Sequence, residues 1–311
     1  MIRLGYACIS MATKNNPNKK TTVGQLEKLD PAGRQKKLRK VMQSNFFNLM
    51  DLLKYNVENG IFLYRLPSEF VPFATHPIAA DWDWEKEFKW DLDKAGEFIR
   101  ANAIRMTSHP GHYSILNTNN PSVLESTIKD FDYHAKVFDL MGLDANSILV
   151  THVGGVYQDK ESSLQRFADH YATLPEHIKK RLVVENDDVS FTMIEVLHLC
   201  EKIGAPMVLD IHHHDCINNG EQIEEYLPRI IATWGDRTPK MHFSSPKSEK
   251  DFRAHADTIE LNAFLRFLDK VSHHNVDIML ECKNKDEALL KLRSELRQAK
   301  VEVESPPLVL A

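Results

Sequence analysis

The stretch MVLDIHHHD, at residues 207–215, joins a short apolar strand pattern to a run of polar side chains. Its first residues are typical of a buried strand, and Asp210 follows them as the first group able to bind a metal ion. The same order, an apolar run and then a histidine or carboxylate, recurs along the chain. It is present in RMTSHPGHY (105–113), ILVTHVGG (148–155), LVVEND (182–187), KMHFS (240–244) and IMLECK (278–283). Carboxyl ends of successive parallel strands meet on one face of a barrel, so the sequence predicts a metal cluster there.

Strand and helix patterns alternate eight times. The strand patterns lie at 3–9, 61–66, 103–107, 148–152, 182–185, 207–210, 239–243 and 277–281. Helical periodicity occupies 30–59, 94–102, 122–141, 161–171, 191–203, 222–233, 260–270 and 285–299. Eight such units predict a single-domain α/β TIM barrel, (β/α)8, over residues 1–300, followed by a C-terminal tail at 301–311. An open doubly wound sheet is the alternative, and it would spread the polar strand ends along a line.

The length and charge of the chain set few limits on its function. With 311 residues and 42% hydrophobic content, the chain is long enough for one large core. Its 39 basic and 44 acidic residues give a formal net charge of −5. This mild negative charge does not indicate a nucleic-acid partner, and it does not exclude one, because binding depends on local patches.

The sequence predicts a soluble cytoplasmic protein. The cysteines at positions 8, 200, 216 and 282 show no CxxC or disulfide-like spacing, so we expect free thiols in a reducing compartment. The opening MIRLGYACI has neither the basic segment nor the long apolar core of a signal peptide. No apolar run approaches the roughly 18 residues that span a bilayer, so we expect no membrane association.

The order of the motifs resembles that of one known family. The sequences LGYACIS, SHPGHY, THVGG, VVENDD, LDIHHHD, KMHFSSP and MLECK follow one another over nearly the whole chain, as in the UV damage endonucleases. This family shares its metal-bearing barrel with endonuclease IV and the xylose isomerase-like enzymes. The resemblance implies a DNA repair enzyme that cuts the phosphodiester bond immediately 5′ of UV photoproducts (cyclobutane dimers and 6-4 photoproducts), with abasic sites as a further substrate. Its partner would be damaged double-stranded DNA, bound by a monomer associated with the nucleoid.

Carried over position by position, the resemblance implies eight metal ligands. They are His109, His152, Glu185, Asp210, His213, His242, His255 and Glu281. Nitrogen and oxygen donors without thiolates suit Mn²⁺, and also Zn²⁺, Co²⁺, Fe²⁺ or Mg²⁺. The family's use of manganese favours two or three Mn²⁺ ions. Within this set the resemblance gives catalytic roles to Glu185, His242 and Glu281, together with Lys240.

One position departs from the endonuclease IV pattern. Arg253 stands where that family is expected to place an aspartate, two residues before the histidine equivalent to His255. In UV damage endonucleases a lysine at the position of Lys240 is described as carboxylated, and it could supply the missing anion. Lys240 and His242 are two residues apart, so on a strand they point to the same face. A buried ammonium beside metal ions would be costly, and Lys240 therefore requires either carboxylation or a shifted pKa if it points inward.

Lesion-probing roles are implied for Tyr6, His112 and Tyr113. His112 departs from the glutamine expected in the family, although an imidazole can also stack on a base and hydrogen-bond. Without the resemblance, Tyr6 would be interpreted as a plain core aromatic. The basic stretch 14–40 is commonly a solvated face, but its place on a loop after the first strand favours phosphate contact.

Several alternatives stay open. A two-metal sugar isomerase or epimerase of the same barrel class would need neither a basic loop nor a lesion probe. A lesion-binding protein with structural metals is the non-catalytic alternative. His212 and His214 could support the ligands or be exposed. Asn186 and Asp187 could orient the ligands by hydrogen bonds or cap the next helix.

Overall fold

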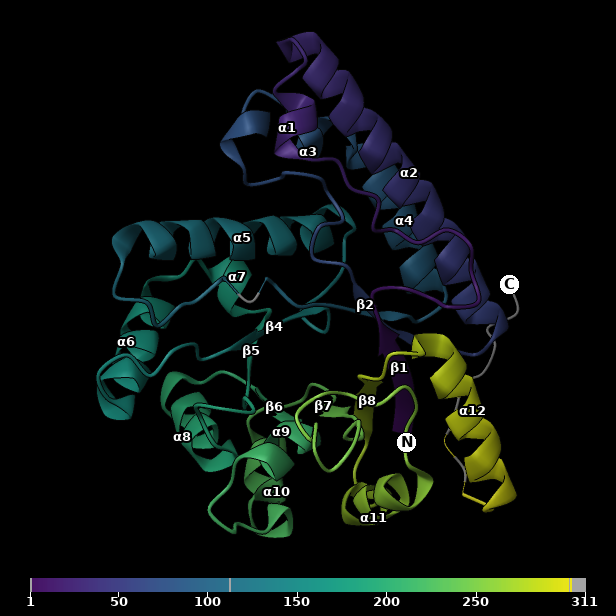
Figure 1. Ribbon diagram of the computed structural model, residues 1–311, viewed down its shortest axis with the longest axis vertical. Coiled ribbons are helices and arrows are strands. Elements are labelled where there is room, and N and C mark those ends of the chain that lie inside the picture. Colours follow the sequence, from purple (N-terminus) through teal and green to yellow (C-terminus); the bar gives the residue numbers. More distant parts are fainter. Residues whose placement is uncertain (1, 112, 302, 304–311) are drawn as a thin grey trace.

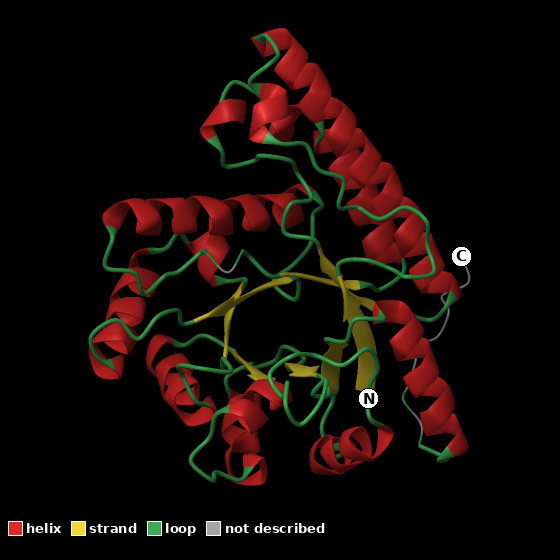
Figure 2. Cartoon of the chain, in the orientation of Figure 1, coloured by secondary structure: helices red, strands yellow, loops and turns green. Residues whose placement is uncertain are grey.

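The computed structural model describes residues 2–111, 113–301 and 303. Eight parallel strands pair in sequence order, and the last pairs with the first, which closes the barrel seen as a ring in Figure 2. The strands are β1 Ile2–Ala7, β2 Leu63–Leu66, β3 Arg105–Ser108, β4 Ile148–His152, β5 Leu182–Glu185, β6 Met207–Asp210, β7 Lys240–Phe243 and β8 Val276–Leu280. The predicted TIM barrel is confirmed, and the open sheet is excluded because a closed barrel has no edges.

A ring of helices surrounds the strands (Figure 1). The eight long ones are α2 Pro31–Glu58, α4 Lys89–Ala101, α5 Pro121–Leu140, α6 Lys160–Thr173, α8 Met193–Ile203, α10 Ile223–Ala232, α11 Leu261–Val271 and α12 Lys285–Gln298. Short elements lie between them: α1 Val23–Leu26, a 3-10 turn η1 Pro77–Ala79, α3 Trp84–Glu87, α7 Glu176–Lys179 and α9 Ile211–Cys216. The sequence patterns did not predict these short elements, because so few residues cannot show a helical period.

Side chains at the helix ends explain where the long helices start and stop. Asp30 accepts a hydrogen bond from the backbone N–H of Gly33, and Pro31 occupies the first turn of α2. Thr192 and Glu195 form a reciprocal capping box at the start of α8. That helix ends at Gly204, whose φ of +69° is a conformation that favours glycine.

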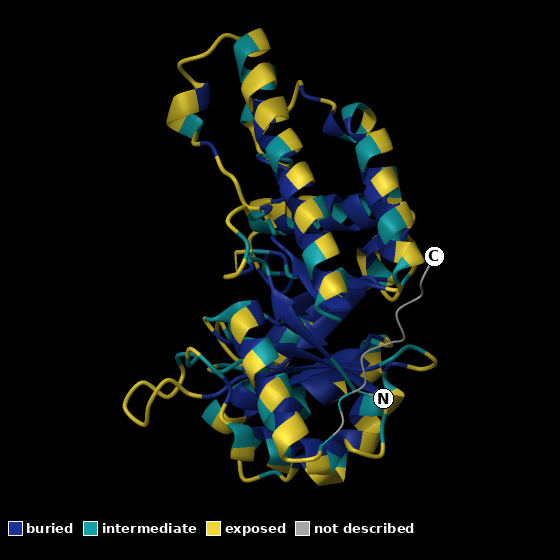
Figure 3. Cartoon of the chain, turned by 90° about the vertical axis from the view of Figure 1, so that its right-hand side faces the viewer, coloured by how far each residue is buried: buried dark blue, intermediate teal, exposed yellow. Residues whose placement is uncertain are grey.

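The largest apolar cluster lies between the sheet and the helices, where Figure 3 shows the strands and the inner helix faces buried. The inside of the barrel is different, because it holds two small apolar clusters and several charged side chains. The clusters are Ile148, Val150, Val183, Val208 and Trp234 on one side and Ala7, Leu63 and Met279 on the other. Near the amino ends of the strands, Asp277 is bound by Arg3 at 2.6 Å and by Arg105 at 2.7 Å. Because this carboxylate is paired twice, the buried charge is compensated.

Helix α2 runs well beyond the barrel, with α1 and α3 near its far end (Figure 1). The long segment between β2 and α4 contains η1 and α3. Trp82 and Trp84 in that segment are buried, and their rings pack edge-on against Phe88 and Tyr133. Trp90, in contrast, is mostly exposed. The contact between Trp84 and Tyr133 therefore packs the start of α3 against α5.

The end of the described chain stays close to the barrel. Val301 and Val303 pack against the core after α12 ends. Residues 302 and 304–311 lie outside the described part, so a separate tail at 301–311 stays a prediction. All four cysteines are free thiols. Among the described residues, no helix combines the length and apolar character needed to cross a membrane.

Candidate metal centre

The strand register brings the predicted ligands to one height at the carboxyl ends of the strands. His152 on β4 is paired with Glu185 on β5, and Asp210 on β6 is paired with His242 on β7. Glu281 directly follows β8, and its backbone N–H donates to the carbonyl of Phe243. Each of these side chains points into the barrel, so residues up to 129 positions apart meet at its mouth.

Glu185 is the hub of the cluster. Its Oε1 lies 2.6 Å from Nδ1 of His242 and 3.6 Å from Nδ1 of His213. Its Oε2 lies 3.4 Å from Nε2 of His109 and 3.6 Å from Nε2 of His152. One carboxylate thus stands between four imidazoles from four different strand ends.

Seven of the eight predicted ligands form three overlapping donor groups. These groups are His109, His152 and Glu185; Glu185, Asp210 and His213; and Glu185, His242 and Glu281. Within each group the donor atoms lie within 4.8 Å of one another. Glu185 belongs to all three, which is the arrangement expected of a carboxylate that bridges neighbouring ions.

Two buried carboxylate oxygen atoms without hydrogen bonds indicate whether divalent cations fit this cluster. Oε2 of Glu185 and Oδ2 of Asp210 accept no hydrogen bond from any described residue. Their nearest imidazole nitrogens stand 3.4 to 3.8 Å away. Donor atoms bound to a common ion at about 2.1 Å stand roughly 3 to 3.5 Å apart, so the spacing suits shared ions better than hydrogen bonds. An unpaired buried carboxylate oxygen is costly, and a divalent cation would remove that cost.

The electrostatics of the cluster agree with a cation site. Burial raises the pKa of Asp210 to about 7, although the neighbouring His213 acts against this shift. Burial alone would lower the pKa of His213, but Asp210 and Glu185 raise it to about 9. Burial lowers the pKa of His242 to about 3, so its imidazole is neutral and keeps a lone pair for a metal ion. The carboxylates of Asp210 and Glu185 therefore depend on nearby positive charge, which His213 supplies here and a bound cation could supply in its place.

Arg65 and Lys240 lie deeper in the barrel beneath the cluster. Lys240 is fully buried and points inward, as its spacing from His242 predicts, and burial holds its pKa well below the usual value. Arg65 Nη2 lies 2.9 Å from Nε2 of His242 and 2.5 Å from Oε1 of Glu281. Sequence reasoning missed Arg65. The signal was a charged residue in the apolar strand LYRL, at the position that alternation assigns to the barrel interior.

Outer partners fix the orientation of the ligands. Asn186 binds the backbone of Asp210 twice, donating from Nδ2 and accepting at Oδ1, both at 2.9 Å. Its own carbonyl is 2.9 Å from Nδ1 of His213. Asp187 instead accepts from the backbone N–H groups of residues 189–191, so it orders the loop. Of the two alternatives left open, Asn186 supports ligands and Asp187 caps the loop before α8.

The segment after Asp210 is a short helix rather than a continued strand. Asp210 caps α9 by accepting from the backbone N–H of His213 at 2.8 Å. This geometry turns His213 toward the cluster and sends His212 and His214 to other sides, both buried. Neither of those two histidines belongs to the three donor groups found among the described residues.

His255 is the one predicted ligand that lies outside the three donor groups of the described chain. Its ring centre is 5.3 Å from that of His212, and Nδ1 of each imidazole is buried without a hydrogen bond to a described residue. Arg253 points away and donates to Asp188 at 2.7 Å. A third ion that includes His255 therefore stays a prediction.

The structure places Tyr6 away from the barrel mouth, and its lesion-probing role stays a prediction. Tyr6 is fully buried on the outer face of the sheet, and its hydroxyl donates to Asn56 of α2 at 2.8 Å. Strand alternation turns it away from the barrel mouth, so it is the core aromatic of the alternative interpretation. His112 lies outside the described residues.

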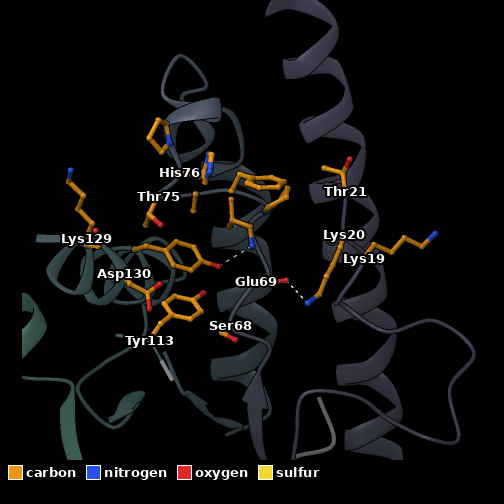
Figure 4. Close-up of a pocket in the computed structure, with 17 residues that line it drawn as sticks. Lys19, Lys20, Thr21, Ser68, Glu69, Thr75, His76, Tyr113, Lys129 and Asp130 are labelled. Atoms are coloured by element: carbon orange, nitrogen blue, oxygen red, sulfur yellow. Dashed lines mark hydrogen bonds and ion pairs between the residues drawn. The ribbon is translucent and has the colours of Figure 1, made fainter. Parts of the chain in front are cut away.

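Tyr113 is 61% exposed and borders a cavity of about 590 Å³ between α5 and the loops after β1 and β2. Figure 4 shows Tyr113 and Asp130 at one side of this cavity, with Lys19 and Lys20 across from them. Lys20 is held by an ion pair of 2.5 Å to Glu69. The cavity lining combines aromatic side chains with three lysines and two carboxylates.

Comparison with known proteins agrees with this geometry. The model of the family UV-endonuclease UvdE matches residues 2–307. A UV DNA damage endonuclease of Bacillus cereus (strain B4264) is 40% identical over 301 residues, covering 95% of both chains. The crystal structure of SacUVDE superposes with a TM-score of 0.88 at 33% identity, covering 97% of this chain and all of that one. Endonuclease IV from Thermus thermophilus shares only the fold, with a TM-score of 0.52 at 16% identity over 95% of this chain and 99% of its own. The resemblance in the sequence is thus confirmed, and the chain belongs to the UV-endonuclease UvdE family.

Proposed function

We propose that this protein is a metal-dependent endonuclease that cuts DNA immediately 5′ of UV photoproducts and leaves a 3′-hydroxyl. Cyclobutane dimers and 6-4 photoproducts are the proposed substrates, with abasic sites as an additional one. Two or three Mn²⁺ ions are the proposed cofactors, and Zn²⁺, Co²⁺ or Mg²⁺ are the alternatives. The protein would act on damaged duplex DNA as a monomer.

The observation that carries this proposal is the position of Glu185 in all three donor groups. A single carboxylate shared by adjacent groups brings several cations close together, as phosphodiester hydrolysis requires. A buried site with three carboxylates and four imidazoles would hold such ions without any thiolate.

The two glutamates of the site carry negative charge for binding cations. Glu185 and Glu281 are held ionised, because the imidazoles of His242 and His152 around Glu185 and the guanidinium of Arg65 beside Glu281 outweigh burial and keep both pKa values low. When bound, divalent ions lower the pKa of a water molecule and offset charge on the phosphate oxygens. Because water is the proposed nucleophile, no covalent intermediate with a side chain is expected.

Contacts with DNA would come from the loops around the barrel mouth. Tyr113 is exposed beside the cavity and could fill the stack that extruded nucleotides leave. Damaged bases stack poorly, so extruding them costs less than extruding normal bases, which favours lesions. Lys19 and Lys20 on the rim would contact phosphates, and binding should therefore weaken steeply as salt rises.

A nicking assay tests the proposal directly. Supercoiled plasmid, UV-irradiated or not, is incubated with the protein and Mn²⁺, and in parallel with EDTA. We expect relaxation of the irradiated plasmid only, and only with Mn²⁺. Mapping of the cut with a duplex that carries one dimer should place it directly 5′ of the lesion. Nicking that is equal on both plasmids, or that survives EDTA, would refute the proposal.

Glu185→Gln is the sharpest variant for this assay. It keeps the size of the side chain but removes the charge shared by the three groups, so nicking should fall by at least about 100-fold while binding of irradiated DNA is largely kept. Glu287→Gln, an exposed glutamate in the first turn of α12, is the matched control and should behave as wild type. Should Glu185→Gln nick as wild type does, the charge shared by the three groups is not needed for cleavage and the proposed role of this centre is refuted. Binding of irradiated DNA by a wild-type protein that does not nick it would favour the lesion-binding alternative. Turnover of a ketose without nicking would favour the isomerase alternative.

A further inference from the structure

Helix α5 turns polar side chains toward the barrel, where an apolar face is expected. Thr127, Asp130 and His134 are buried, and their spacing of i, i+3 and i+7 places them on one side of the helix. Buried polar groups are costly unless they are hydrogen-bonded, so their partners are informative. The first pair is local: Oγ1 of Thr127 accepts from the backbone N–H of Ile115 at 3.0 Å.

The other two partners lie at the two ends of the segment 108–114. Ser108 is the last residue of β3, and its Oγ is 2.8 Å from Nδ1 of His134. Ser114 Oγ donates to Oδ2 of Asp130 at 2.5 Å. One helix face therefore holds the start and the end of this segment, which carries His109 and Tyr113 between its ends.

Asp130 and His134 also face each other. Oδ1 of Asp130 is 3.7 Å from Nε2 of His134, one helical turn away. Burial lowers the pKa of His134 to about 4, so its imidazole is neutral near pH 7. Nε2 of His134 is buried without a hydrogen bond to a described residue, so Asp130 acts on it through charge alone and favours the imidazole proton on that nitrogen. Nδ1 is then left to accept from the hydroxyl of Ser108. A change at Asp130 would thus reach Ser108 through a single imidazole.

We propose that Asp130 and His134 are positioning residues that hold Ser108 and Ser114, so that the neighbouring His109 is directed at the metal centre and the neighbouring Tyr113 at the DNA. The part concerning Tyr113 rests on the proposed function, whereas the part concerning His109 rests only on metal binding. Asp130 also forms part of the cavity wall beside Tyr113 in Figure 4, so the cavity and the metal centre share one support. Outer partners of metal ligands commonly change metal affinity or activity by about 10- to 100-fold.

Titration of chelator-stripped protein with Mn²⁺ tests the proposal without relying on DNA cleavage. His134→Leu should weaken Mn²⁺ affinity by about tenfold or more, and Ser108→Ala, which removes one oxygen atom, should weaken it in the same direction. His134→Gln keeps a group that can bond to Ser108 and should recover most of the affinity. The matched control is His177→Leu, because His177 makes the other histidine–aspartate contact of α5, at 2.7 Å to Asp132, away from the segment. It should bind Mn²⁺ as wild type does.

The Mn²⁺ titrations can overturn the proposed positioning role. Unchanged Mn²⁺ affinity in Ser108→Ala and His134→Leu would overturn the proposal, and so would an equal loss in His177→Leu, which would indicate general softening of α5. If His134→Leu does not fold, Ser108→Ala alone tests the same contact. A wild-type protein that fails to nick irradiated plasmid, while the variants still differ in Mn²⁺ affinity, would refute the proposed function and leave this inference standing.

Discussion

The side-chain nitrogen of Lys240 lies 2.5 Å from Nε2 of His242 inside the barrel. Nη2 of Arg65 approaches the same nitrogen at 2.9 Å, while Nδ1 of His242 faces Glu185 at 2.6 Å. An imidazole that binds a cation through Nδ1 keeps its proton on Nε2, and this N–H then needs an acceptor. Arg65 has donors only. With a cation bound at Nδ1, Lys240 would have to supply the acceptor, as a neutral amine or as a carbamate.

We predict that Lys240 is carboxylated in the active protein. Burial already holds its pKa well below the usual value, and the unprotonated amine is the form that adds carbon dioxide. Protein equilibrated with ¹³C-bicarbonate should show a carbamate carbonyl signal by NMR, and Lys240→Met should lack it. Nicking by Lys240→Met should fall by about 10- to 100-fold because the partner of His242 is lost. Lys247→Met, at an exposed lysine, is the control. A wild-type spectrum without the signal would leave the neutral amine as the acceptor.

Asp210 predicts an unusual pH dependence of stability in the metal-free protein. Burial, reinforced by the charges of Glu185 and Glu281, raises its pKa to about 7, against about 3.9 in an unfolded chain. Between these values the folded state binds the extra proton. The free energy of unfolding therefore falls as pH rises from about 4 to about 7, and this loss is complete above that range.

Asp210→Asn has no ionisable carboxylate at this position, so it should not lose stability as the pH rises. The variant keeps a side-chain oxygen that accepts from the backbone N–H of His213. In EDTA near pH 8 we expect the variant to be more stable than wild type by roughly 2 to 4 kcal/mol, with the difference vanishing near pH 4. Urea unfolding at both pH values measures it. Saturating Mn²⁺ should reverse the order, because the variant lacks a carboxylate ligand. A variant that is less stable than wild type in EDTA near pH 8 would contradict the buried-charge account.

The strand ends could be predicted from the sequence because each combines an apolar run with a chemically distinct last residue. The bounds of β4, β5 and β6 match the predicted ranges. Once eight parallel units close, the face on which His152, Glu185 and Asp210 meet follows from topology alone. No side-chain packing was needed to place them.

The features of the site that the sequence did not reveal share a physical cause. They depend on which side of an element a residue faces and on contacts with residues distant in sequence. Tyr6 was assigned to the DNA through the resemblance alone, and the sequence did not show that it is an outward-facing strand residue bonded to α2. Arg65 was not singled out, because its partner His242 is 177 residues away. His134 is an ordinary hydrogen-bonded core histidine, but its partner, 26 residues away, could not be predicted. Helical or strand periodicity shows that such residues are buried, but it cannot show which polar group satisfies them.

Tyr113→Ala should weaken recognition of lesions with little effect on folding, because most of this side chain is exposed. Loss of one stacking ring is worth about 1 to 3 kcal/mol, so KM for a duplex with one dimer should rise about tenfold or more. Binding of undamaged duplex and the Tm in EDTA should change little. Tyr113→Phe keeps the ring and should match wild type within about twofold. If Tyr113→Phe is as impaired as Tyr113→Ala, the hydroxyl rather than stacking is responsible.

Arg65 should stabilise the protein more when the metal site is empty than when it is filled. Its guanidinium is 2.5 Å from Oε1 of Glu281, and it is the main group that holds the pKa of Glu281 low against burial. Arg65→Met leaves the carboxylate of Glu281 beside Glu185 without the guanidinium that pairs with it. In EDTA the free energy of unfolding should therefore fall by about 3 kcal/mol. Bound Mn²⁺ offsets the same charge, so the loss in Mn²⁺ should be clearly smaller. Urea unfolding under both conditions measures this difference, with the exposed Arg253→Met as control. An equal loss in EDTA and in Mn²⁺ would mean that Arg65 contributes through packing rather than through charge.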